Sequence, residues 1–455
     1  MNRSSLDRIH TQILWDRLLA VVEEQAQTLV RTAFSTTVRE AGDISAGVFD
    51  TQGRMLAQAV TGTPGHVNAM AASVGFFLQK FPVEDLHPED VLLTNDPWYG
   101  TGHLNDFTVI TPVFRKGRPV ALFAATSHIA DVGGLGFGPD GRQVFEEGLN
   151  IPMGYLYRAG EPNEVLLEIL RANVRDPRSA EGDLHSLTAC NRAGVESLLA
   201  TLDEFGMDDL DTAGRVIVDN SRDAMLAEIR KLPFGTWSNA MRIDGYDEPV
   251  DLVCSLTISE TGIDVSFDGS SPVCSHGINV PLTYTQAYAS FGVRCVVGND
   301  IPNNAGSLEV VRVTAPEGCI LNAPRPAAVS ARHAIGQMLP DVVLGCLEEP
   351  LGGNVPAEGA SCLFGPVFLG GRGLVPGSES EAFVINAFYA GGTGGRPGKD
   401  GLDCTAFPSV VKSTPVEITE NAAPLIIWQK EYRPGSGGAG EFRGGVGQIM
   451  EFAHA

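Results

Sequence analysis

The chain has 455 residues, enough for roughly two to four structural units of about 150 residues each, and its 43% hydrophobic and 19% charged residues exclude a disordered protein. The formal net charge of −23 argues against nucleic acid as a partner and is typical of a soluble protein. No run of about 18 apolar residues would span a membrane, no secretion signal opens the chain, and none of its eight cysteines forms a C-x-x-C pair, so a cytoplasmic location with reduced thiols is expected.

Local patterns predict the elements of the first half in chain order. Apolar residues recur at three- and four-residue steps over 5–33, which predicts one long amphipathic helix. A strand, a turn at Asp50–Gly53 and a second strand follow, and then a helix over 67–80. The segment VLLTNDPW is expected to end a strand in a loop, and the next two strands form a hairpin around Lys116-Gly117.

The pattern changes towards the C-terminus. Residues 161–232 are predicted to be mainly helical, up to a proline that ends the helical region. From about residue 238, alternating apolar and polar residues predict strands, with helices near 284–296 and 334–349. These elements predict a multi-lobed mixed α/β (α+β) fold, with a helical N-terminal segment and loops on a β scaffold in residues 1–237 and a strand-rich half in residues 238–455.

The densest group of candidate functional residues lies in the run NDPWYGTGHLND, which contains His103 and Asp106. Asp43 lies upstream in GDIS, and His128 ends a predicted strand in TSHIAD. Two imidazoles and two carboxylates suit one divalent transition metal: imidazole favours Zn, Fe or Mn, and two carboxylates favour Mn or Fe without excluding Zn. Ordinary polar loop residues remain an equal alternative at this point, because spacing does not prove that side chains converge.

Four other residues are candidates for catalytic or supporting roles. His66 lies at the start of a predicted helix, where it either caps the helix or faces a substrate. Asp131 lies three residues after His128 and is predicted to orient an imidazole through its second ring nitrogen. Glu146 and Glu147, in VFEEGLNIP, are candidates for acid/base chemistry, with solvated loop residues as the alternative interpretation.

Two glycine-rich runs imitate nucleotide-binding loops. Gly136, Gly138 and Gly141 have the spacing of a dinucleotide fingerprint, but no strand adjoins them and no helix clearly follows. The run GGTGGRPGKD places Asp400 where a P-loop has Ser or Thr, and a carboxylate there would repel phosphate. Both runs are interpreted as turns, which favours a nucleotide site on a partner rather than on this chain.

Many segments resemble the hydantoinase B/oxoprolinase family, which comprises the B-type chain of N-methylhydantoinases and the matching half of 5-oxoprolinase. They are also similar to the α subunits of acetone carboxylase and related ketone carboxylases. The resemblance covers nearly the whole chain as one family domain. The segments that carry it include REAGDISAGVFDTQGRMLAQA, PGHVNAM, LTNDPWYGTGHLNDFTVITPVF, TSHIADVGG, EEGLNIP, RANVRDPRSAEGDLHSLTACNRAG, IPNNAGSLEVVRV and STPVEITE.

The resemblance implies a metal site and a division of labour. The family's site uses an Asp, a His-x-x-Asp pair and a later His, which match Asp43, His103, Asp106 and His128. An A-type subunit of the actin/hexokinase-like class would bind ATP and phosphorylate a small cyclic amide, such as a lactam, a hydantoin or oxoproline. This chain, as the B-type subunit, would hydrolyse the activated intermediate with a water whose pKa the metal lowers towards about 7.

Two other functions remain open. A chain of the same family could be the α-type subunit of an ATP-dependent ketone carboxylase, which joins phosphorylated bicarbonate to an enol phosphate. A non-catalytic scaffold is a further alternative, although a scaffold has no need of the four-residue set. Members of the family usually run longer, so a C-terminal segment is expected either to be missing or to lie on another chain, and the resemblance implies a hetero-oligomer.

Overall fold

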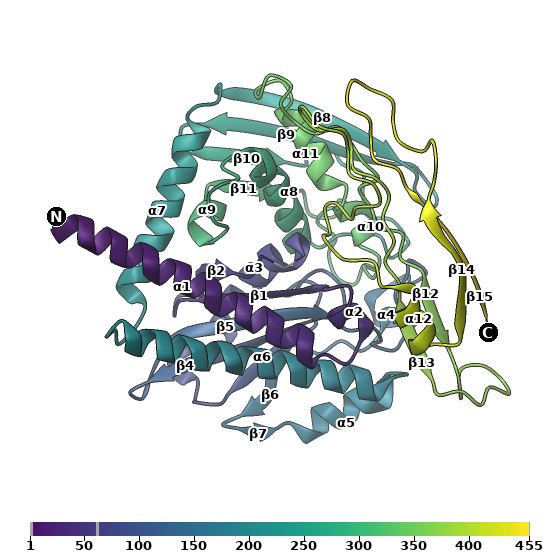
Figure 1. Cartoon of the computed structure of the whole chain (residues 1–455), viewed down its shortest axis with the longest axis horizontal. Coiled ribbons are helices and arrows are strands. Elements are labelled where there is room, and N and C mark those ends of the chain that lie inside the picture. Colours follow the sequence, from purple (N-terminus) through teal and green to yellow (C-terminus); the bar gives the residue numbers. More distant parts are fainter. Residues whose placement is uncertain (1–2, 61–62, 455) are drawn as a thin grey trace.

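The computed structural model describes residues 3–60 and 63–454, and its mixed α/β architecture of several open sheets confirms the predicted fold class (Figure 1). No helix in these residues is long and apolar enough to cross a membrane. The first elements along the chain are α1 (Arg3–Thr32), α2 (Thr36–Arg39), β1 (Ile44–Phe49), β2 (Met55–Gln58), α3 (Pro64–Lys80), η1 (Val83–Asp85), β3 (Val91–Thr94), β4 (Asp106–Arg115), β5 (Arg118–His128), α4 (Val144–Glu147), β6 (Gly154–Arg158), β7 (Glu161–Pro162), α5 (Glu164–Asn173), α6 (Pro177–Glu204) and α7 (Asp211–Ile229).

The local predictions for this half are confirmed with small changes at the ends of elements. The long first helix, the turn between β1 and β2, and the β4–β5 hairpin all form where the patterns place them. The helix α3 begins at Pro64, three residues earlier than predicted. Proline suits the first helical position because its fixed φ fits the helix and its missing N–H would have no partner there.

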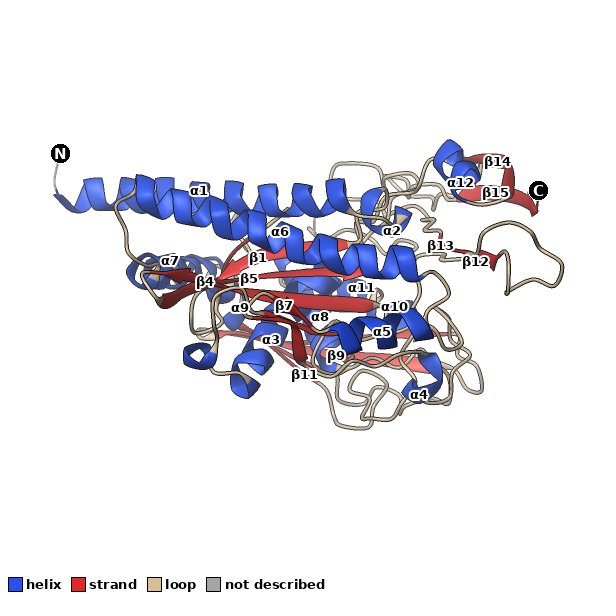
Figure 2. Cartoon of the chain, turned by 90° about the horizontal axis from the view of Figure 1, so that it is seen from below, coloured by secondary structure: helices blue, strands red, loops and turns tan. Residues whose placement is uncertain are grey.

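A seven-stranded antiparallel sheet organises the first half in the order β2-β1-β5-β4-β3-β6-β7. The helices α1 and α6 cover one face and α3 covers the other (Figure 2). Successive strand residues therefore enter different cores: Phe123 packs under α1 and α6, whereas Leu122 and Ala124 pack under α3. Because both faces are covered, the central strands are buried along nearly their whole length.

A four-stranded sheet, in the order β11-β10-β9-β8, organises the next part of the chain. The helices α8 and α11 pack against it, and α8 also packs against α3, which joins the two sheets through helices. The elements are β8 (Gly235–Ile243), β9 (Val250–Ser259), β10 (Gly262–Ser266), α8 (Leu282–Val296), α9 (Ala305–Glu309), β11 (Val311–Thr314), α10 (His333–Gly336) and α11 (Leu339–Leu347).

One predicted helix of this region is divided in two in the structure. The single helix predicted over 334–349 is wrong in detail, because it is divided into α10 and α11 with Pro340 in the first turn of α11. Proline lacks the N–H that a continuous helix would need at that position. The strand β8 crosses residue 237, and the division into halves at 237/238 stays a prediction.

The last hundred residues consist mainly of loops with two small antiparallel strand pairs, which Figure 1 shows near the C-terminus. They contribute little regular structure, but some of their loops reach back to the first half and help to enclose the site described next. The elements are β12 (Val367–Gly370), β13 (Phe383–Asn386), α12 (Val416–Ala422), β14 (Leu425–Tyr432) and β15 (Gln448–His454).

Candidate metal centre

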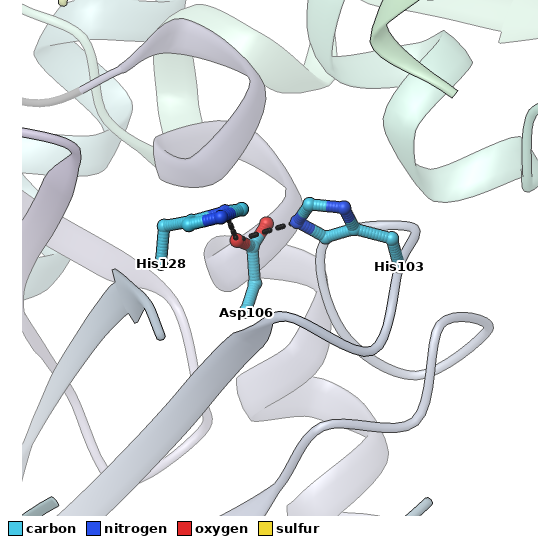
Figure 3. Close-up of side chains that lie close together, drawn as sticks. All are labelled: His103, Asp106 and His128. Atoms are coloured by element: carbon cyan, nitrogen blue, oxygen red, sulfur yellow. Dashed lines mark hydrogen bonds and ion pairs between the residues drawn. The ribbon is translucent and has the colours of Figure 1, made fainter. Parts of the chain in front are cut away.

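Strand register places three of the predicted ligands at one edge of the seven-stranded sheet. Asp106 begins β4 and lies directly opposite His128, which ends β5. Asp43 immediately precedes β1, and its carbonyl oxygen accepts a hydrogen bond from the His128 backbone N–H at 3.2 Å. Directly opposed residues point to the same face of a sheet, so Asp106 and His128 both face α3. The side chains meet: the His128 Nδ1 lies 3.1 Å from the Asp106 Oδ1 (Figure 3).

The fourth predicted ligand, His103, reaches Asp106 from the loop between β3 and β4 (Figure 3). The side-chain amide of Asn95 closes this loop by donating to the carbonyl oxygens of Leu104 and Leu149 at 2.7 and 2.8 Å. The His103 Nε2 then lies 2.6 Å from the Asp106 Oδ1. His103, Asp106 and His128 offer ligand atoms within 4.8 Å of one another and form a candidate metal site.

Asp43 borders this site without joining that compact group. Its Oδ2 lies 4.0 Å from the His128 Nδ1, and its Oδ1 accepts a hydrogen bond from the Thr63 hydroxyl at 2.8 Å. The structure thus brings all four predicted ligands to one place, with three of them converging and Asp43 at the margin.

His66 does not cap α3, whose N-cap residue is Thr63, and instead points its ring at the carboxylates. Its Nε2 lies 2.9 Å from the Asp106 Oδ2 and its Nδ1 lies 3.5 Å from the Asp43 Oδ1. Burial opposes protonation of His66, but the Asp106 and Asp43 carboxylates outweigh it and raise its pKa. Of the two predicted alternatives, helix capping is therefore wrong, and the other, that His66 faces a substrate, stays a prediction.

Arg332 crosses from the second half of the chain and supplies the charge that balances Asp106. Its Nη2 donates to the Asp106 Oδ2 at 2.7 Å, its Nε donates to the Thr101 carbonyl oxygen at 2.8 Å, and its guanidinium lies over the ring of Tyr284. Burial alone would raise the pKa of Asp106, but the positive charge of its neighbours, among them the Arg332 guanidinium, outweighs burial and holds that pKa well below its usual value. Asp106 is therefore ionised although it is fully buried.

The state of His103 tests whether a metal ion suits this cluster. Its Nδ1 donates to the Ser330 carbonyl oxygen at 3.0 Å, so its Nε2 carries the lone pair. Burial, assisted by the Arg332 guanidinium, lowers the pKa of His103 to about 4, so the ring is neutral at neutral pH. Within the described residues the Nε2 has no hydrogen bond, although the Asp106 Oδ1 is 2.6 Å away. A lone pair and a carboxylate oxygen this close repel each other unless a cation lies beside both, so the residues fit a divalent transition metal.

Asn386, the last residue of β13, contacts the outer nitrogen of His128. The Asn386 side-chain amide lies 2.9 Å from the His128 Nε2, and the Asn386 Oδ1 is buried without a hydrogen-bond partner in the described chain. Rotating this amide by half a turn would let its oxygen accept a proton from Nε2 and leave Nδ1 free as a ligand. Asn386 is thus able to select which nitrogen of His128 carries the proton.

A small cavity of about 20 Å³ lies among these residues. Its volume suffices for one water-sized occupant, since a water needs roughly 10–15 Å³ of such space. A cyclic amide does not fit in this conformation. A much larger cavity of about 740 Å³ lies among the glycine-rich C-terminal loops, but its lining contains no histidine and only one acid, Glu358. The smaller cavity is lined by Asp43, Thr63, His66, His103, His128, Phe137, Tyr284, Arg332, His333, Gln337, Leu363, Phe388, Ser409 and Val411.

The other predicted catalytic residues lie outside this cavity. Asp131 does not orient an imidazole: it accepts hydrogen bonds from the Arg175 guanidinium and from the Gly133 backbone, because the chain turns away after β5. Glu146 is exposed and accepts from the Arg142 backbone N–H at 2.8 Å. Glu147 is buried, and burial raises its pKa to about 7, but its carboxylate contacts a backbone loop and not the cavity.

Sequence reasoning missed several residues that complete the site, including Phe137, Arg332, His333 and Asn386. Phe137 packs against three imidazoles, those of His103, His128 and His333. Burial and the nearby Arg332 hold the pKa of His333 well below its usual value, so this ring is neutral. One signal was available: the chain has only nine histidines, and four of them line the cavity.

Comparison with known proteins supports one family over the length of the chain. Residues 7–455 match the family model described as hydantoinase B/oxoprolinase. The B-type chain of a putative D-/L-hydantoinase from a Pseudomonas strain is 28% identical over 468 residues, which cover 98% of this chain and 78% of that protein. 5-Oxoprolinase 1 from Arabidopsis thaliana is 28% identical over 477 residues, which cover 98% of this chain and 36% of that protein.

Two solved structures have the same fold. An ATP-dependent caprolactamase from Pseudomonas jessenii superposes with a TM-score of 0.89 and 25% identity, covering 98% of this chain and 78% of that chain. A nucleotide-free acetone carboxylase superposes with the same TM-score of 0.89 at 21% identity, covering 97% of this chain and 62% of that chain. The second likeness concerns the fold alone.

Proposed function

We propose, since this chain belongs to the hydantoinase B/oxoprolinase family, that it is the metal-site, B-type subunit of an ATP-dependent cyclic-amide hydrolase. A partner A-type subunit would use ATP to phosphorylate a lactam, hydantoin or oxoproline, and this chain would hydrolyse the activated intermediate. Relatives and neighbours named as a putative hydantoinase, a 5-oxoprolinase and an ATP-dependent caprolactamase support this class of reaction. Phosphorylation makes chemical sense because it makes the amide carbon a better electrophile: water adds to that carbon, the ring C–N bond breaks as the nitrogen takes up a proton, and hydrolysis of the resulting acyl phosphate releases phosphate.

The observation that carries the proposal is the neutral His103 nitrogen 2.6 Å from the ionised Asp106 carboxylate. This arrangement suits a cation bound by His103, Asp106 and His128, with Asp43 as the fourth ligand that the family pattern implies. A divalent ion there would supply Lewis-acid activation of water or of the substrate. Zn, Mn and Fe all remain compatible with two imidazoles and two carboxylates.

The chain's own residues would prepare the site for this chemistry. Arg332 keeps Asp106 ionised and fixes its Oδ2 at 2.7 Å. His66 holds its Nε2 proton on the same carboxylate and keeps its Nδ1 beside Asp43, so it is the cavity's best-placed group for exchanging a proton with substrate. Phe137 and Phe388 lie beside the His128 ring and exclude bulk water from it.

We place the ATP site on the partner. Neither glycine-rich run of this chain has the strand-loop-helix context of a phosphate loop. Residues 133–142 form a loop, and the next helix is α4, which has a single turn. After Gly391–Asp400 the chain continues through turns, and the next helix is α12. The A-type subunit would be the ATP-binding chain of the actin/hexokinase-like class that the resemblance implies.

The test is reconstitution of this chain with the A-type subunit of the same organism. ATP hydrolysis is measured with hydantoin, 5-oxoproline or a lactam, and separately with a ketone plus bicarbonate. Turnover that depends on a cyclic amide supports the proposal. Turnover that depends on bicarbonate would assign the chain to the ketone carboxylases, and absence of turnover with every substrate would favour a scaffold.

A further inference from the structure

We propose that Glu147 is a positioning residue that holds His103 in its metal-binding orientation through the backbone of Ser330. The proposal rests on the metal-binding part of the proposed function and gives Glu147 a role other than acid/base chemistry on the substrate. It concerns a residue that lies outside the cavity and touches none of the predicted ligands directly.

Three hydrogen bonds connect Glu147 to His103. The Glu147 Oε1 accepts from the backbone N–H groups of Val329 and Ser330 at 2.7 and 2.8 Å. The Ser330 carbonyl oxygen then accepts from the His103 Nδ1 at 3.0 Å. A carboxylate that holds two successive N–H groups fixes the orientation of that backbone, and therefore the direction in which the Ser330 carbonyl points.

The last bond of this chain decides the chemistry of His103. While Nδ1 donates to Ser330, the lone pair is on Nε2, the atom that faces Asp106. If the Ser330 carbonyl turned away, the imidazole would be free to carry its proton on Nε2 and donate it to the Asp106 carboxylate. That tautomer pairs well with Asp106 but has no lone pair for a metal at this position.

The surroundings of Glu147 are built to keep its carboxylate in place. It is only 2% exposed, and its second oxygen has no hydrogen-bond partner in the described chain. A Cβ added to Gly277 would lie 3.0 Å from the Glu147 Oε1, and one added to Gly141 would lie 3.0 Å from its Cγ. Burial raises the pKa of Glu147 to about 7, so the fold retains a carboxyl group that is costly to ionise there.

Other bonds hold the same loop on either side of the Glu147 contact. The Asn279 side-chain amide donates to the Ala328 carbonyl oxygen at 2.9 Å, and the Ala331 N–H donates to the Gly277 carbonyl oxygen at 2.7 Å. Removal of the Glu147 carboxylate is therefore expected to turn the Val329–Ser330 backbone without unfolding the loop. Loss of such an outer partner of a metal-binding imidazole weakens metal affinity by about 10- to 100-fold.

The experiment compares cobalt(II) binding by the wild-type chain and its variants at pH 7.5, through the visible absorption of the bound ion and chelator competition. Cobalt binding by the wild type is measured first, and its absence would count against the proposed function itself. Glu147→Ala is expected to bind cobalt at least about 10-fold more weakly with an altered spectrum, whereas Glu147→Gln, which keeps an accepting oxygen, stays within about threefold.

Asp183 offers a matched control at another site. Like Glu147, Asp183 is buried, and its Oδ1 accepts from two successive backbone N–H groups, those of Phe34 and Ser35, at 2.7 and 3.2 Å. Its Oδ2 has no hydrogen-bond partner among the residues that the structure describes. Asp183→Ala is expected to lower the melting temperature but to keep cobalt affinity within about threefold of the wild type. A loss of affinity as large as that of Glu147→Ala would reduce the role of Glu147 to general stability and overturn the proposal.

If Glu147→Ala does not fold, Gly277→Ala replaces it as the deciding variant. Its added methyl group presses on the Glu147 Oε1 without removing the carboxylate. Weaker cobalt binding by this variant supports the proposal, and affinity and spectrum equal to those of the wild type overturn it. Wild-type affinity and spectrum in a folded Glu147→Ala chain overturn it as well.

Discussion

The edge of the seven-stranded sheet and the loops of the second half contribute to the candidate metal centre in different ways. The sheet edge supplies Asp106 and His128, whose places follow from strand pairing. The second half supplies Ser330 and Arg332 from a loop and Asn386 from the end of β13, and these contact His103, Asp106 and His128, respectively, from more than 200 residues further along the chain. Strand pairing thus sets where the ligands lie, while the loops set their charge and their tautomers. The predictions below test whether these two contributions are separable.

The largest effect is expected for Asp106→Ala, which damages both contributions at once. The substitution removes a ligand and leaves the buried Arg332 guanidinium without its carboxylate. Breaking such a buried pair costs about 3–5 kcal/mol, so the free energy of unfolding should fall by that amount, measured by urea denaturation, and bound metal should be lost. The control is Asp50→Ala, whose partner Arg54 is 31% exposed and can be solvated. A change below about 1 kcal/mol for Asp106→Ala would contradict the pairing.

The next effect concerns the pH dependence of stability, and it comes from Glu147 of α4, which holds the Val329–Ser330 loop. The pKa of Glu147 rises from 4.5 to about 7 on folding, so the folded chain binds the proton more tightly than the unfolded chain between these pH values. Stability from this group is therefore lost as pH rises from about 4.5 to about 7, which is worth about 3 kcal/mol at about 1.4 kcal/mol per pKa unit. Glu147→Gln should remove this loss, because glutamine does not titrate. The unfolding free energy of the variant should therefore rise relative to that of the wild type as pH increases across the same range. Parallel pH profiles for both chains would contradict it.

His103→Ala should remove a ligand while leaving the strand edge intact. The affinity for metal is expected to fall at least about 100-fold, which corresponds to about 2.7 kcal/mol. Elemental analysis after dialysis against a chelator measures the metal that stays bound. His87→Ala is the control, because that imidazole is 66% exposed and lies away from the cavity. Unchanged metal stoichiometry in His103→Ala would show that the ligand assignment is wrong.

The smallest effect is expected at Asn386, which acts on His128 from the loop side. Asn386→Leu removes the contact to the His128 Nε2 and should weaken metal affinity by about 10-fold, whereas Asn386→Asp keeps an acceptor there and should preserve it. Metal competition titrations compare the two variants. Equal affinity in both would mean that strand pairing by itself orients His128.

Much of the fold follows from local patterns, because the elements that carry it have strong periodicity. The helix α1, the β4–β5 hairpin and the alternating strand β9 all form where the apolar spacing predicts them. The break between α10 and α11 was missed, although Pro340 was visible in the sequence, because the apolar pattern continues through it. Packing against α8 and β9 then accommodates α11 as a separate helix.

The candidate site was predictable as a set of residue types but not as an arrangement. Asp43, His103, Asp106 and His128 were selected from their residue types, and family resemblance then favoured them as a ligand set; the structure brings them together, although their role as ligands stays a prediction. Asp131 was expected beside an imidazole and binds Arg175 instead. Its position three residues after His128 gave no information about which way the chain turns after the strand ends.

The sequence by itself determined the local helices and strands, because these depend on near neighbours along the chain. It also determined which imidazoles and carboxylates are present. Only the tertiary structure decided that Asp106 faces His128. Arg115 pairs with Arg118 next to the hairpin turn, and a regular ladder continued from this pair would place Asp106 opposite Ser127. A bulge between Val113 and Phe114 shifts the register by one residue, so that Asp106 lies opposite His128 instead. One residue of register turns a side chain to the other face of the sheet, and no local pattern in the sequence records that shift.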